Sequence, residues 1–462
     1  MPGTYHLYLA VIVFLVTYAV IVTEKIHRTV AAFAGAAVVV LAGITPPEKA
    51  VAAIDWNTIG LLVGMMIIVG LTRETGIFEF LAIKAAQAAG GHPPAILASL
   101  AGVTAVVSSV LDNVTTVLLI VPVTLAIAGK LKINPLPFLV AEILASNIGG
   151  TATLIGDPPN IMIGSAAGLG FMDFVINLTP VIVLIHVTTV FILQLIYRKE
   201  LRLPDEHRNG ILEFDARAEL KNPSLLRKCI TVLGLVIVGF LLHQYLHLES
   251  SVIALSGAAL LLVITRTDPE EPLSFVEWPV IFFFAGLFII VGALEAVGII
   301  GALARLSLEA TGGQTILSGM LVMWISALAS SFVDNIPFVA TMIPLLKEVG
   351  RLAHMSVGDL HFLWWCLSLG ACLGGNGTII GASANVIVAG IAEKRGLYLT
   401  FAGFMKVAFP LMLMSLVIST VYMVLWFFLQ NILVISSFLA LSGLAVLILR
   451  FRAERPCRAE GP

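Results

Sequence analysis

Charged residues are scarce in this chain of 462 residues: they make up 12% of it, while hydrophobic residues make up 59%. Soluble domains carry about a quarter of their residues as charges. Apolar runs of the length that crosses a bilayer, roughly 17 to 25 residues, recur along the sequence. The composition therefore predicts an all-α polytopic membrane protein in contact with membrane lipid.

Cysteine is rarer still, and its four residues have no metal-binding spacing. Cys366 and Cys372 do not share a helix face, so we expect them to be small packing residues. The sequence has no nucleotide-binding loop and no pair of histidines on one helix face. We therefore expect no enzyme, no cofactor except bound Na⁺, and no use of ATP within this chain, while an associated ATPase subunit stays open. The net charge of −2 gives no indication of a nucleic-acid partner.

The apolar runs predict about 11 spans, two of them interrupted. They lie at about 5–23, 29–45, 56–72, 136–169 (interrupted), 174–197, 228–246, 251–266, 278–294, 360–392 (interrupted), 401–429 and 431–450. Two shorter segments, 76–90 and 298–310, combine glycine with scattered charge, and we expect interfacial helices there.

One stretch of the sequence returns in a diverged copy. Residues 108–122 read SSVLDNVTTVLLIVP, and residues 330–344 read SSFVDNIPFVATMIP, with an offset of 222. Residues 145–160 read ASNIGGTATLIGDPPN, and residues 371–385 read ACLGGNGTIIGASAN, with an offset of 225 for the shared Thr, Gly and Asn. The chain therefore contains two repeats.

The repeats divide the chain into two membrane parts. We expect a first membrane repeat at 1–198, a cytoplasmic linker at 199–226, a second membrane repeat at 227–450 and a cytoplasmic tail at 451–462. Each copy of the repeat contains five predicted crossings, and the span 431–450 follows the second copy. Because five is odd, the second copy should be inverted in the membrane, as in many secondary transporters.

Lysine and arginine are unevenly distributed over the predicted loops. With the N-terminus outside, only four of the 26 lie outside the cell: Lys49, Arg305, Lys347 and Arg351. Because cytoplasmic loops carry an excess of these residues, the sequence predicts a protein of the cytoplasmic membrane with its N-terminus outside and its C-terminus cytoplasmic.

Each repeat contains an Asp-Asn pair between two apolar arms. The arms are either two short crossings or a re-entrant hairpin, and the polar turn favours the hairpin because non-helical backbone at membrane depth needs protein or water around it. Asp112 and Asp334 are then expected to approach each other near the midplane. Their simplest role is to cap the second arm, but a carboxylate inside the membrane also marks an ion path. The candidate Na⁺ ligands are Asp112, Asn113, Asp334 and Asn335.

Hydroxyl groups follow both Asp-Asn pairs. Thr115, Thr116 and Thr341 supply neutral oxygens for an ion or solute, or donate to a carbonyl one helical turn back. Which of these two roles they have is left open by the sequence.

The two interrupted spans are rich in Gly, Thr, Asn and Pro where a crossing is expected. Glycines allow unusual backbone angles, and Pro158 and Pro159 cannot continue a preceding helix. Helix ends inside the membrane would then bind an anionic group or a cation. The candidate binding residues are Asn147, Thr151, Thr153 and Asn160 in the first repeat, and Asn376, Thr378, Ser383 and Asn385 in the second.

The repeats differ in two carboxylates. Asp157 aligns with Ala382, and Glu142 aligns with Leu367. Asp157 either carries a proton or braces the proline turn, and Glu142 is either a coupling residue or the partner of a buried polar group. The candidates for proton or ion coupling are Asp112, Asp157, Asp334 and Glu142.

The repeated motifs resemble those of the ion-transporter superfamily that includes the arsenite-efflux pump ArsB, the NhaD sodium/proton antiporters and CitMHS-like permeases. LDNVTTVLLIVPVT, NIGGTATLIGDPPN, VDNIPFVATMIP and GACLGGNGTIIGASAN are most similar to the P protein (pink-eyed dilution) group and its bacterial relatives. The resemblance implies two repeats with opposed hairpins, a scaffold that forms a homodimer, and an elevator-type movement of the hairpins and broken helices.

These observations favour an ion-coupled secondary active transporter, an H⁺- or Na⁺-coupled antiporter that moves a small inorganic ion or an oxyacid such as arsenite. The alternatives are a Na⁺/H⁺ antiporter, a Na⁺-coupled symporter of a small organic anion such as a dicarboxylate or citrate, and a passive anion channel. A channel would need a continuous pore, whereas opposed hairpins would close one.

Overall fold

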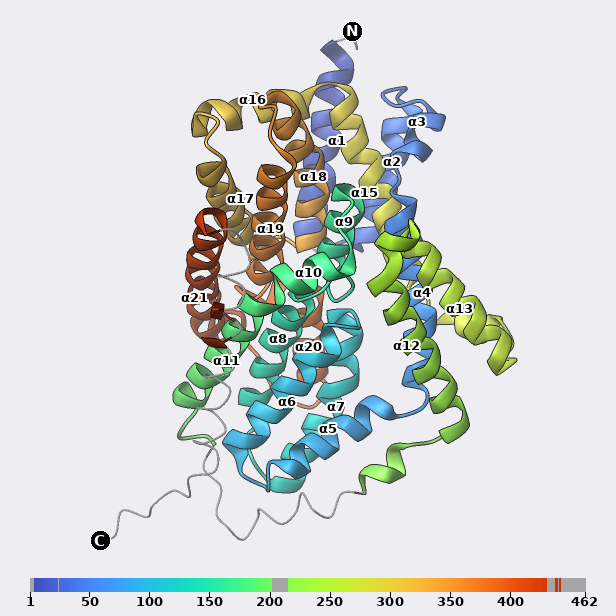
Figure 1. The fold of residues 1–462 in the computed structure, drawn as a ribbon, viewed down its shortest axis with the longest axis vertical. Helices are drawn as coiled ribbons and strands as arrows, with labels where there is room; N and C mark the ends of the chain where they lie inside the picture. The colour runs from blue at the N-terminus through green and yellow to red at the C-terminus, as the bar shows by residue number, and fades with distance from the viewer. Residues whose placement is uncertain (1–3, 24, 202–214, 430–436, 439, 442–462) are drawn as a thin grey trace. The chain divides into compact units, whose positions relative to one another are not determined.

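The computed structural model describes residues 4–23, 25–201, 215–429, 437–438 and 440–441, and all of its regular elements are helical (Figure 1). Eight helices are long and apolar enough to cross a membrane, or up to ten if each of two bent pairs forms one span. The predicted all-helical membrane fold is confirmed. The predicted tail, residues 202–214 of the linker and most of the predicted span 431–450 lie outside the described residues.

The first half of the chain contains eleven described α-helices. They are α1 (Thr4–Thr23), α2 (Arg28–Leu41), α3 (Pro47–Ala52), α4 (Trp56–Arg73), α5 (Ile77–Ala88), α6 (Pro93–Ser108), α7 (Asn113–Leu131), α8 (Leu136–Thr151), α9 (Pro158–Ala167), α10 (Phe171–Asn177) and α11 (Thr179–Ile196).

The second half repeats much of this order. Its elements are η2 (Ala216–Glu219), α12 (Pro223–Leu246), α13 (Ser250–Thr265), α14 (Glu270–Ser274), α15 (Trp278–Ala296), α16 (Ile299–Thr311), α17 (Thr315–Ser330), α18 (Asn335–Leu352), α19 (Val357–Gly374), η3 (Ile379–Gly381), α20 (Ser383–Glu393) and α21 (Phe401–Phe428).

Both helix breaks lie where the sequence predicts them. The first span breaks between α8 and α9, and α9 begins at the proline pair, where a missing backbone N–H costs no helical hydrogen bond. The second breaks between α19 and α20. The predicted span 174–197 begins inside α10, a short helix that follows α9 at a bend of 113° and was not expected. The short helices α3 and α14 were not expected either.

The chain folds into two compact units that interleave the repeats. Unit 1 comprises residues 1–74, 158–172 and 222–375, and unit 2 comprises residues 75–157, 173–221 and 376–462. Each unit therefore holds one predicted hairpin, the first half of that repeat's broken span and the second half of the other broken span. In unit 2 these are α6 and α7, α8 and α20; in unit 1 they are α17 and α18, α19 and α9.

Glycine lets the first half of each broken span pack closely on the hairpin arm beside it. In unit 2, a Cβ on Gly149 of α8 would lie 2.2 Å from the carbonyl oxygen of Ala105 on α6. In unit 1, a Cβ on Gly374 of α19 would lie 2.5 Å from the carbonyl oxygen of Ala327 on α17. Both contacts are to backbone, which cannot move aside, so each pair of helices is held at a distance that only glycine allows.

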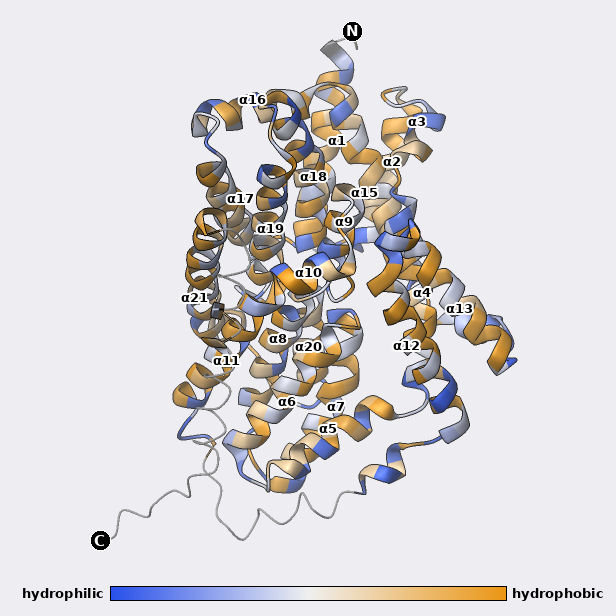
Figure 2. Cartoon of the chain, in the orientation of Figure 1, coloured by the Kyte–Doolittle hydropathy of each residue, from blue (hydrophilic) through white to orange (hydrophobic). Residues whose placement is uncertain are grey.

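The remaining helices of unit 1 pack in pairs with apolar surfaces. Gly64 of α4 packs against the backbone of Ala254 on α13, and Gly286 of α15 packs against the backbone of Ala32 on α2. Hydrophobic residues cover most of α12, whose hydrophilic residues gather at its ends (Figure 2). This distribution is typical of a helix that crosses a bilayer.

Replacing Gly149 by alanine should destabilise the protein, although alanine is the better helix former. The added methyl group meets the Ala105 backbone, and such overpacking costs about 1–3 kcal/mol. The measurement is the midpoint of thermal unfolding in detergent. Gly102→Ala on α6 is the matched control, because a Cβ there meets nothing within 4 Å. Equal midpoints for the two variants would show that α8 does not need this close approach.

Candidate functional site

The tip of the first hairpin is a helix cap. Asp112 precedes α7, and its Oδ1 accepts a hydrogen bond of 2.8 Å from the backbone N–H of Thr115. The Thr116 hydroxyl donates to the Asp112 carbonyl oxygen at 2.9 Å. The capping role of Asp112 and the back-bonding role of Thr116 are both confirmed.

Four buried asparagines form a network in unit 2. Asn147 on α8 accepts a hydrogen bond of 3.0 Å from the Nδ2 of Asn113, the first residue of α7. The Nδ2 of Asn147 donates to the side-chain oxygens of Asn376 at 3.0 Å and Asn385 at 2.9 Å. Asn113 Nδ2 also lies 3.5 Å from Asp157 Oδ1. We call Asn113, Asn147, Asp157, Asn376 and Asn385 the asparagine network.

Three helix ends meet at the asparagine network. Asn113 begins α7, Asn385 lies in the first turn of α20, and Asn147 lies one turn before the end of α8 (Figure 1). Helix N-termini carry partial positive charge and free N–H groups, whereas a helix C-terminus carries free carbonyl groups. The network therefore combines hydrogen-bond donors and acceptors with the field of two N-termini and one C-terminus.

Threonine hydroxyls predicted to belong to this site donate hydrogen bonds to backbone carbonyls around it. Thr151 donates to the carbonyl of Asn147 at 2.7 Å, and Thr153 donates to the carbonyl of Ser109 in the hairpin turn. Asn385 Nδ2 donates to the carbonyl of Thr378 at 2.8 Å. Ser383 is the first residue of α20. These contacts fix the broken segments against the hairpin tip.

The second hairpin tip carries an ion pair, and the first tip has none with the described residues of its own unit. Asp334 caps α18 by accepting from the N–H of Ile336 at 3.1 Å. Its other oxygen accepts from the guanidinium of Arg28 at the start of α2, at 2.7 Å. The Arg28 guanidinium carbon also lies 5.2 Å from the centre of the Phe283 ring, within cation–π range.

A tyrosine of α1 also holds the second hairpin. The Tyr18 hydroxyl donates to the carbonyl of Pro337 at 2.6 Å and lies 2.8 Å from the Thr341 hydroxyl. Thr341 donates back to Pro337 at 3.1 Å, which confirms the back-bonding alternative for this residue. Arg28 and Tyr18 together tie the second tip to the N-terminal helices of unit 1.

Unit 1 contains a reduced counterpart of the asparagine network. Asn160, the equivalent of Asn385, accepts from the Ser368 hydroxyl at 2.6 Å and lies 3.5 Å from the sulfur of Cys372. With the offset of 225, Cys372 takes the place of Asn147. A thiol is only a weak donor and acceptor, so this position no longer links three side chains. Asn335 is buried at the start of α18.

The predicted site residues are thus divided between the two units. Unit 2 brings together Asp112, Asn113, Asn147, Asp157 and Asn385, with Thr115, Thr116, Thr151, Thr153, Asn376, Thr378 and Ser383. Unit 1 holds Asn160, Asp334, Asn335 and Thr341. The predicted approach of Asp112 to Asp334 joins residues of different units and stays a prediction.

Several partners were not predicted from the sequence. The distribution of lysine and arginine predicted Arg28 in a cytoplasmic loop, and Ser368 and Tyr18 lie outside the repeated motifs. Glu142, predicted as a coupling residue, lies fully buried on α8 and accepts a hydrogen bond from Thr124 on α7. This contact confirms that Glu142 has a buried polar partner.

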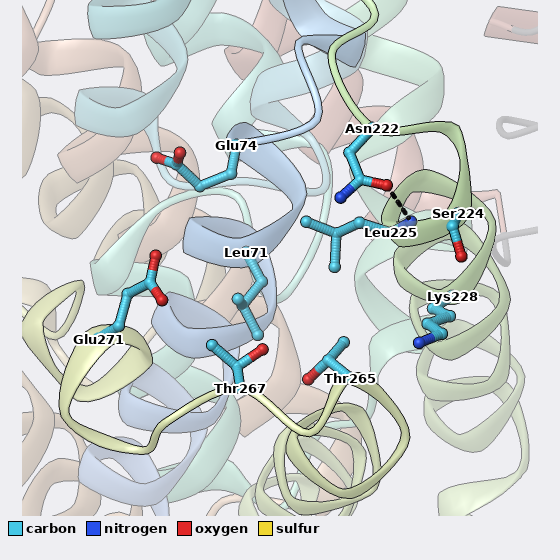
Figure 3. Close-up of a pocket in the computed structure, with 9 residues that line it drawn as sticks. All are labelled: Leu71, Glu74, Asn222, Ser224, Leu225, Lys228, Thr265, Thr267 and Glu271. Carbon is cyan, nitrogen blue, oxygen red and sulfur yellow. Dashed lines mark hydrogen bonds between the residues drawn. The ribbon is translucent and has the colours of Figure 1, made fainter.

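A cavity of about 330 Å³ lies elsewhere in unit 1, at the ends of α4, α12, α13 and α14 (Figure 3). Glu74 and Glu271 line one side of it and Lys228 the other, where the Lys228 ammonium donates to the carbonyl of Ile264 at 2.8 Å. None of the site residues predicted from the sequence lines this cavity.

Comparison with known proteins decides the family. Residues 18–370 match the family model described as citrate transporter (CitMHS), which is well over half of the chain. The protein belongs to this family. The resemblance predicted from the hairpin and broken-span motifs is therefore confirmed, and this CitMHS member is a membrane transporter.

Relatives of this CitMHS member match most of its length. A 46 kDa membrane protein of Mycobacterium leprae is 43% identical over 420 residues, 90% of this chain and 97% of the relative. An uncharacterized transporter of Mycobacterium tuberculosis is 43% identical over 424 residues, 91% of this chain and 98% of the relative. The P protein of Mus musculus is 36% identical over 88% of this chain, which spans 59% of the P protein.

A solved structure shares the fold. The YdaH transporter of Alcanivorax borkumensis superposes with a TM-score of 0.56 and 14% identity, covering 83% of this chain and 88% of that chain. At this identity the match shows the fold alone.

The ion pair at the second tip of this CitMHS member should contribute to its stability. Arg28→Gln leaves the mostly buried Asp334 carboxylate without its cation, and loss of a charged hydrogen bond costs about 2 kcal/mol. A double-mutant cycle with Asp334→Asn, read by thermal unfolding in detergent, measures the coupling. We expect the double variant to be more stable than the sum of the single effects predicts. Additive effects would show that the pair contributes nothing.

Proposed function

We propose that the protein is an ion-coupled secondary active transporter whose solute binds at the asparagine network of unit 2. The observation that carries the proposal is the position of this network, where a hairpin tip and two broken spans meet in a chain whose family consists of transporters. Buried amides that bond to one another can exchange those bonds for bonds to a solute. Such a site discriminates solutes by hydrogen bonding.

The chemistry of the network favours a small inorganic ion or an uncharged oxyacid. Its hydrogen-bond partners are amides, the Asp157 carboxylate and a backbone carbonyl. The N-termini of α7 and α20 favour oxygen-rich solutes that carry negative charge or accept hydrogen bonds. Arsenite, an uncharged trihydroxide at neutral pH, needs both donors and acceptors and fits this set.

We place the coupling ion, H⁺ or Na⁺, at the first tip rather than the second. Asp334 and Asn335 were candidate Na⁺ ligands, but the Arg28 guanidinium already balances the Asp334 charge. Asp112 caps α7 and has no ion-pair partner among the described residues of its unit, so it can share a cation with Asn113. Asp157 lies beside Asn113 and is the second candidate for coupling.

A small organic anion is the second candidate solute, and the family match supports it. The family model is described as citrate transporter. Carboxylates are usually bound by arginine or lysine, and the described contacts of the asparagine network include neither. We therefore rank citrate or a dicarboxylate below an inorganic solute. Na⁺/H⁺ antiport without another solute, and a passive anion channel, are the remaining alternatives.

The membrane arrangement is part of the proposal. We propose that the N-terminus is outside and the C-terminus cytoplasmic, from the distribution of lysine and arginine. The family resemblance supports inverted repeats, a homodimer and an elevator-type movement.

The testing experiment uses purified protein in proteoliposomes with an internal pH-sensitive dye and an imposed pH gradient. Na⁺, Li⁺, arsenite, chloride, phosphate and citrate are added in turn. Collapse of the gradient by arsenite supports the proposal. Collapse by Na⁺ or Li⁺ alone makes the protein a cation/proton antiporter, and collapse by citrate favours the organic anion. Anion flux without proton movement would favour the channel.

Asn147→Ala and Cys372→Ala form a matched pair for this assay, because they occupy equivalent positions of the two repeats. Asn147→Ala removes the side chain that joins three others, and we expect solute flux to fall at least tenfold. Cys372→Ala should retain flux near the wild-type rate. Equal flux in the two variants would place the solute outside the asparagine network.

Asp112→Asn should abolish coupled flux while the protein still folds. Asparagine caps a helix about as well as aspartate, so the α7 N-terminus stays intact while the negative charge is lost. Flux is measured in the same proteoliposomes, and thermal unfolding in detergent checks the fold. If the variant transports at the wild-type rate, Asp112 is a helix cap and nothing more.

A further inference from the structure

A second polar group lies inside unit 2, apart from the asparagine network. Glu142 on α8 is fully buried, and one of its carboxyl oxygens accepts a hydrogen bond from the hydroxyl of Thr124 on α7. The other oxygen, Oε2, is buried and has no hydrogen-bond partner among the described residues. Glu142 lies five residues before Asn147, about 7.5 Å along the axis of α8.

The elements packed against α8 bring no charge to Glu142. These elements are α6, α7, α11, α20 and α21. Helix α6 has no titratable residue, and the titratable or charged side chains of the other four are Lys130, His186, Glu393, Lys406 and Tyr422. Among the described residues, none of them interacts with the Glu142 carboxyl, whose one side-chain partner is Thr124.

The second repeat shows that the fold does not need this polar pair. With the repeat offsets of 222 and 225, Thr124 corresponds to Leu346 and Glu142 to Leu367. Both leucines are buried, at 1% and 0% exposure. At the positions that Thr124 occupies on α7 and Glu142 on α8, the second repeat therefore has packed leucines on α18 and α19. A buried carboxyl that packing does not require needs another explanation.

An unpaired ionised carboxylate is costly inside protein or lipid, whereas the neutral acid is tolerated. A carboxyl group in this position releases its proton when water reaches it and binds a proton again when water is excluded. The Thr124 hydroxyl donates to Oε1 and so stabilises the anion for the time that the proton is absent. Oε2 is the oxygen left to hold the proton.

We propose that Glu142 is the proton-carrying group of this transporter, separate from the residues that bind the solute. The carboxylic acid takes its proton from water on one side of the membrane and releases it to water on the other, and Thr124 positions the carboxyl group. This inference rests on the proposed function, and it assigns the proton to Glu142, which leaves Na⁺ as the cation for the first tip.

Two readouts test the proposal on the full-length protein in lipid. The first is infrared spectroscopy between acidic and alkaline pH, which detects the carbonyl band of protonated carboxylic acids without any solute. We expect a band that titrates in the wild type and is missing in Glu142→Gln. The second readout is flux in proteoliposomes with arsenite, citrate and Na⁺. For each solute, proton movement is measured with an imposed pH gradient, and solute exchange is measured without a gradient.

Glu142→Gln keeps the shape and a hydrogen bond to Thr124 but cannot ionise. We expect it to lose proton movement at least tenfold while retaining solute exchange near the wild-type rate. Thr124→Leu/Glu142→Leu, which installs the pair of the second repeat, should fold with wild-type thermal stability or better and show the same loss. Proton movement at the wild-type rate in either variant would overturn the proposal.

The outcomes separate this inference from the proposed function. If the wild type moves no protons with any of the three solutes, the proposed proton coupling fails. If the titrating carbonyl band is then also present in Glu142→Gln, the inference about Glu142 is refuted as well. If the wild type couples protons to a solute and Glu142→Gln does so equally, only the role of Glu142 is refuted. Loss of exchange together with proton movement would make Glu142 part of the solute site and would equally refute its separate role.

Discussion

The side-chain amide of Asn147 is the interaction on which the candidate site depends. Breaking a helix leaves backbone N–H and C=O groups without partners, and apolar surroundings make each of them costly. An amide offers two donors and an acceptor without a charge. Asn147 uses all three to join the hairpin tip to the two segments around Asn376 and Asn385. These uncharged links hold the hairpin tip beside the broken segments, and other side chains bond the freed backbone, as Asn385 does with the carbonyl of Thr378.

The sequence predicts the parts of the fold that local chemistry determines. Asp112 and Asp334 cap the helices that follow them, and the proline pair starts α9, because caps and prolines act within one helical turn. The repetition of these signals at nearly constant offset predicts both hairpins and both breaks. Helix α10 was missed because only Asn177, Thr179 and Pro180 interrupt the apolar residues that lead into α11, so hydropathy shows one span where the structure has two helices.

Pairings between distant segments could not be predicted from one sequence. Arg28 binds Asp334 across 306 residues, and Asn147 binds Asn385 across 238. Nothing in the local sequence at Arg28 distinguishes a residue that reaches a hairpin tip from one in a loop. The interleaving of the repeats has the same cause: which half of a broken span packs with which hairpin is determined by tertiary contacts such as those of Gly149 and Gly374.

The differences between the two repeats indicate which residues maintain the fold and which are available for transport. Both units keep the capping aspartate, the glycine contacts and an asparagine in the first turn after the break, so these features maintain the fold. Only the first repeat keeps Asn147 and Glu142, where the second has Cys372 and Leu367. Among the described residues, only the second tip has an arginine partner within its unit. A duplicated fold needs its common residues for structure, and the polar groups retained in one copy alone are free to serve transport. By this reasoning we propose that unit 2 holds the solute and the coupling ion, while unit 1 ties its hairpin to the N-terminal helices.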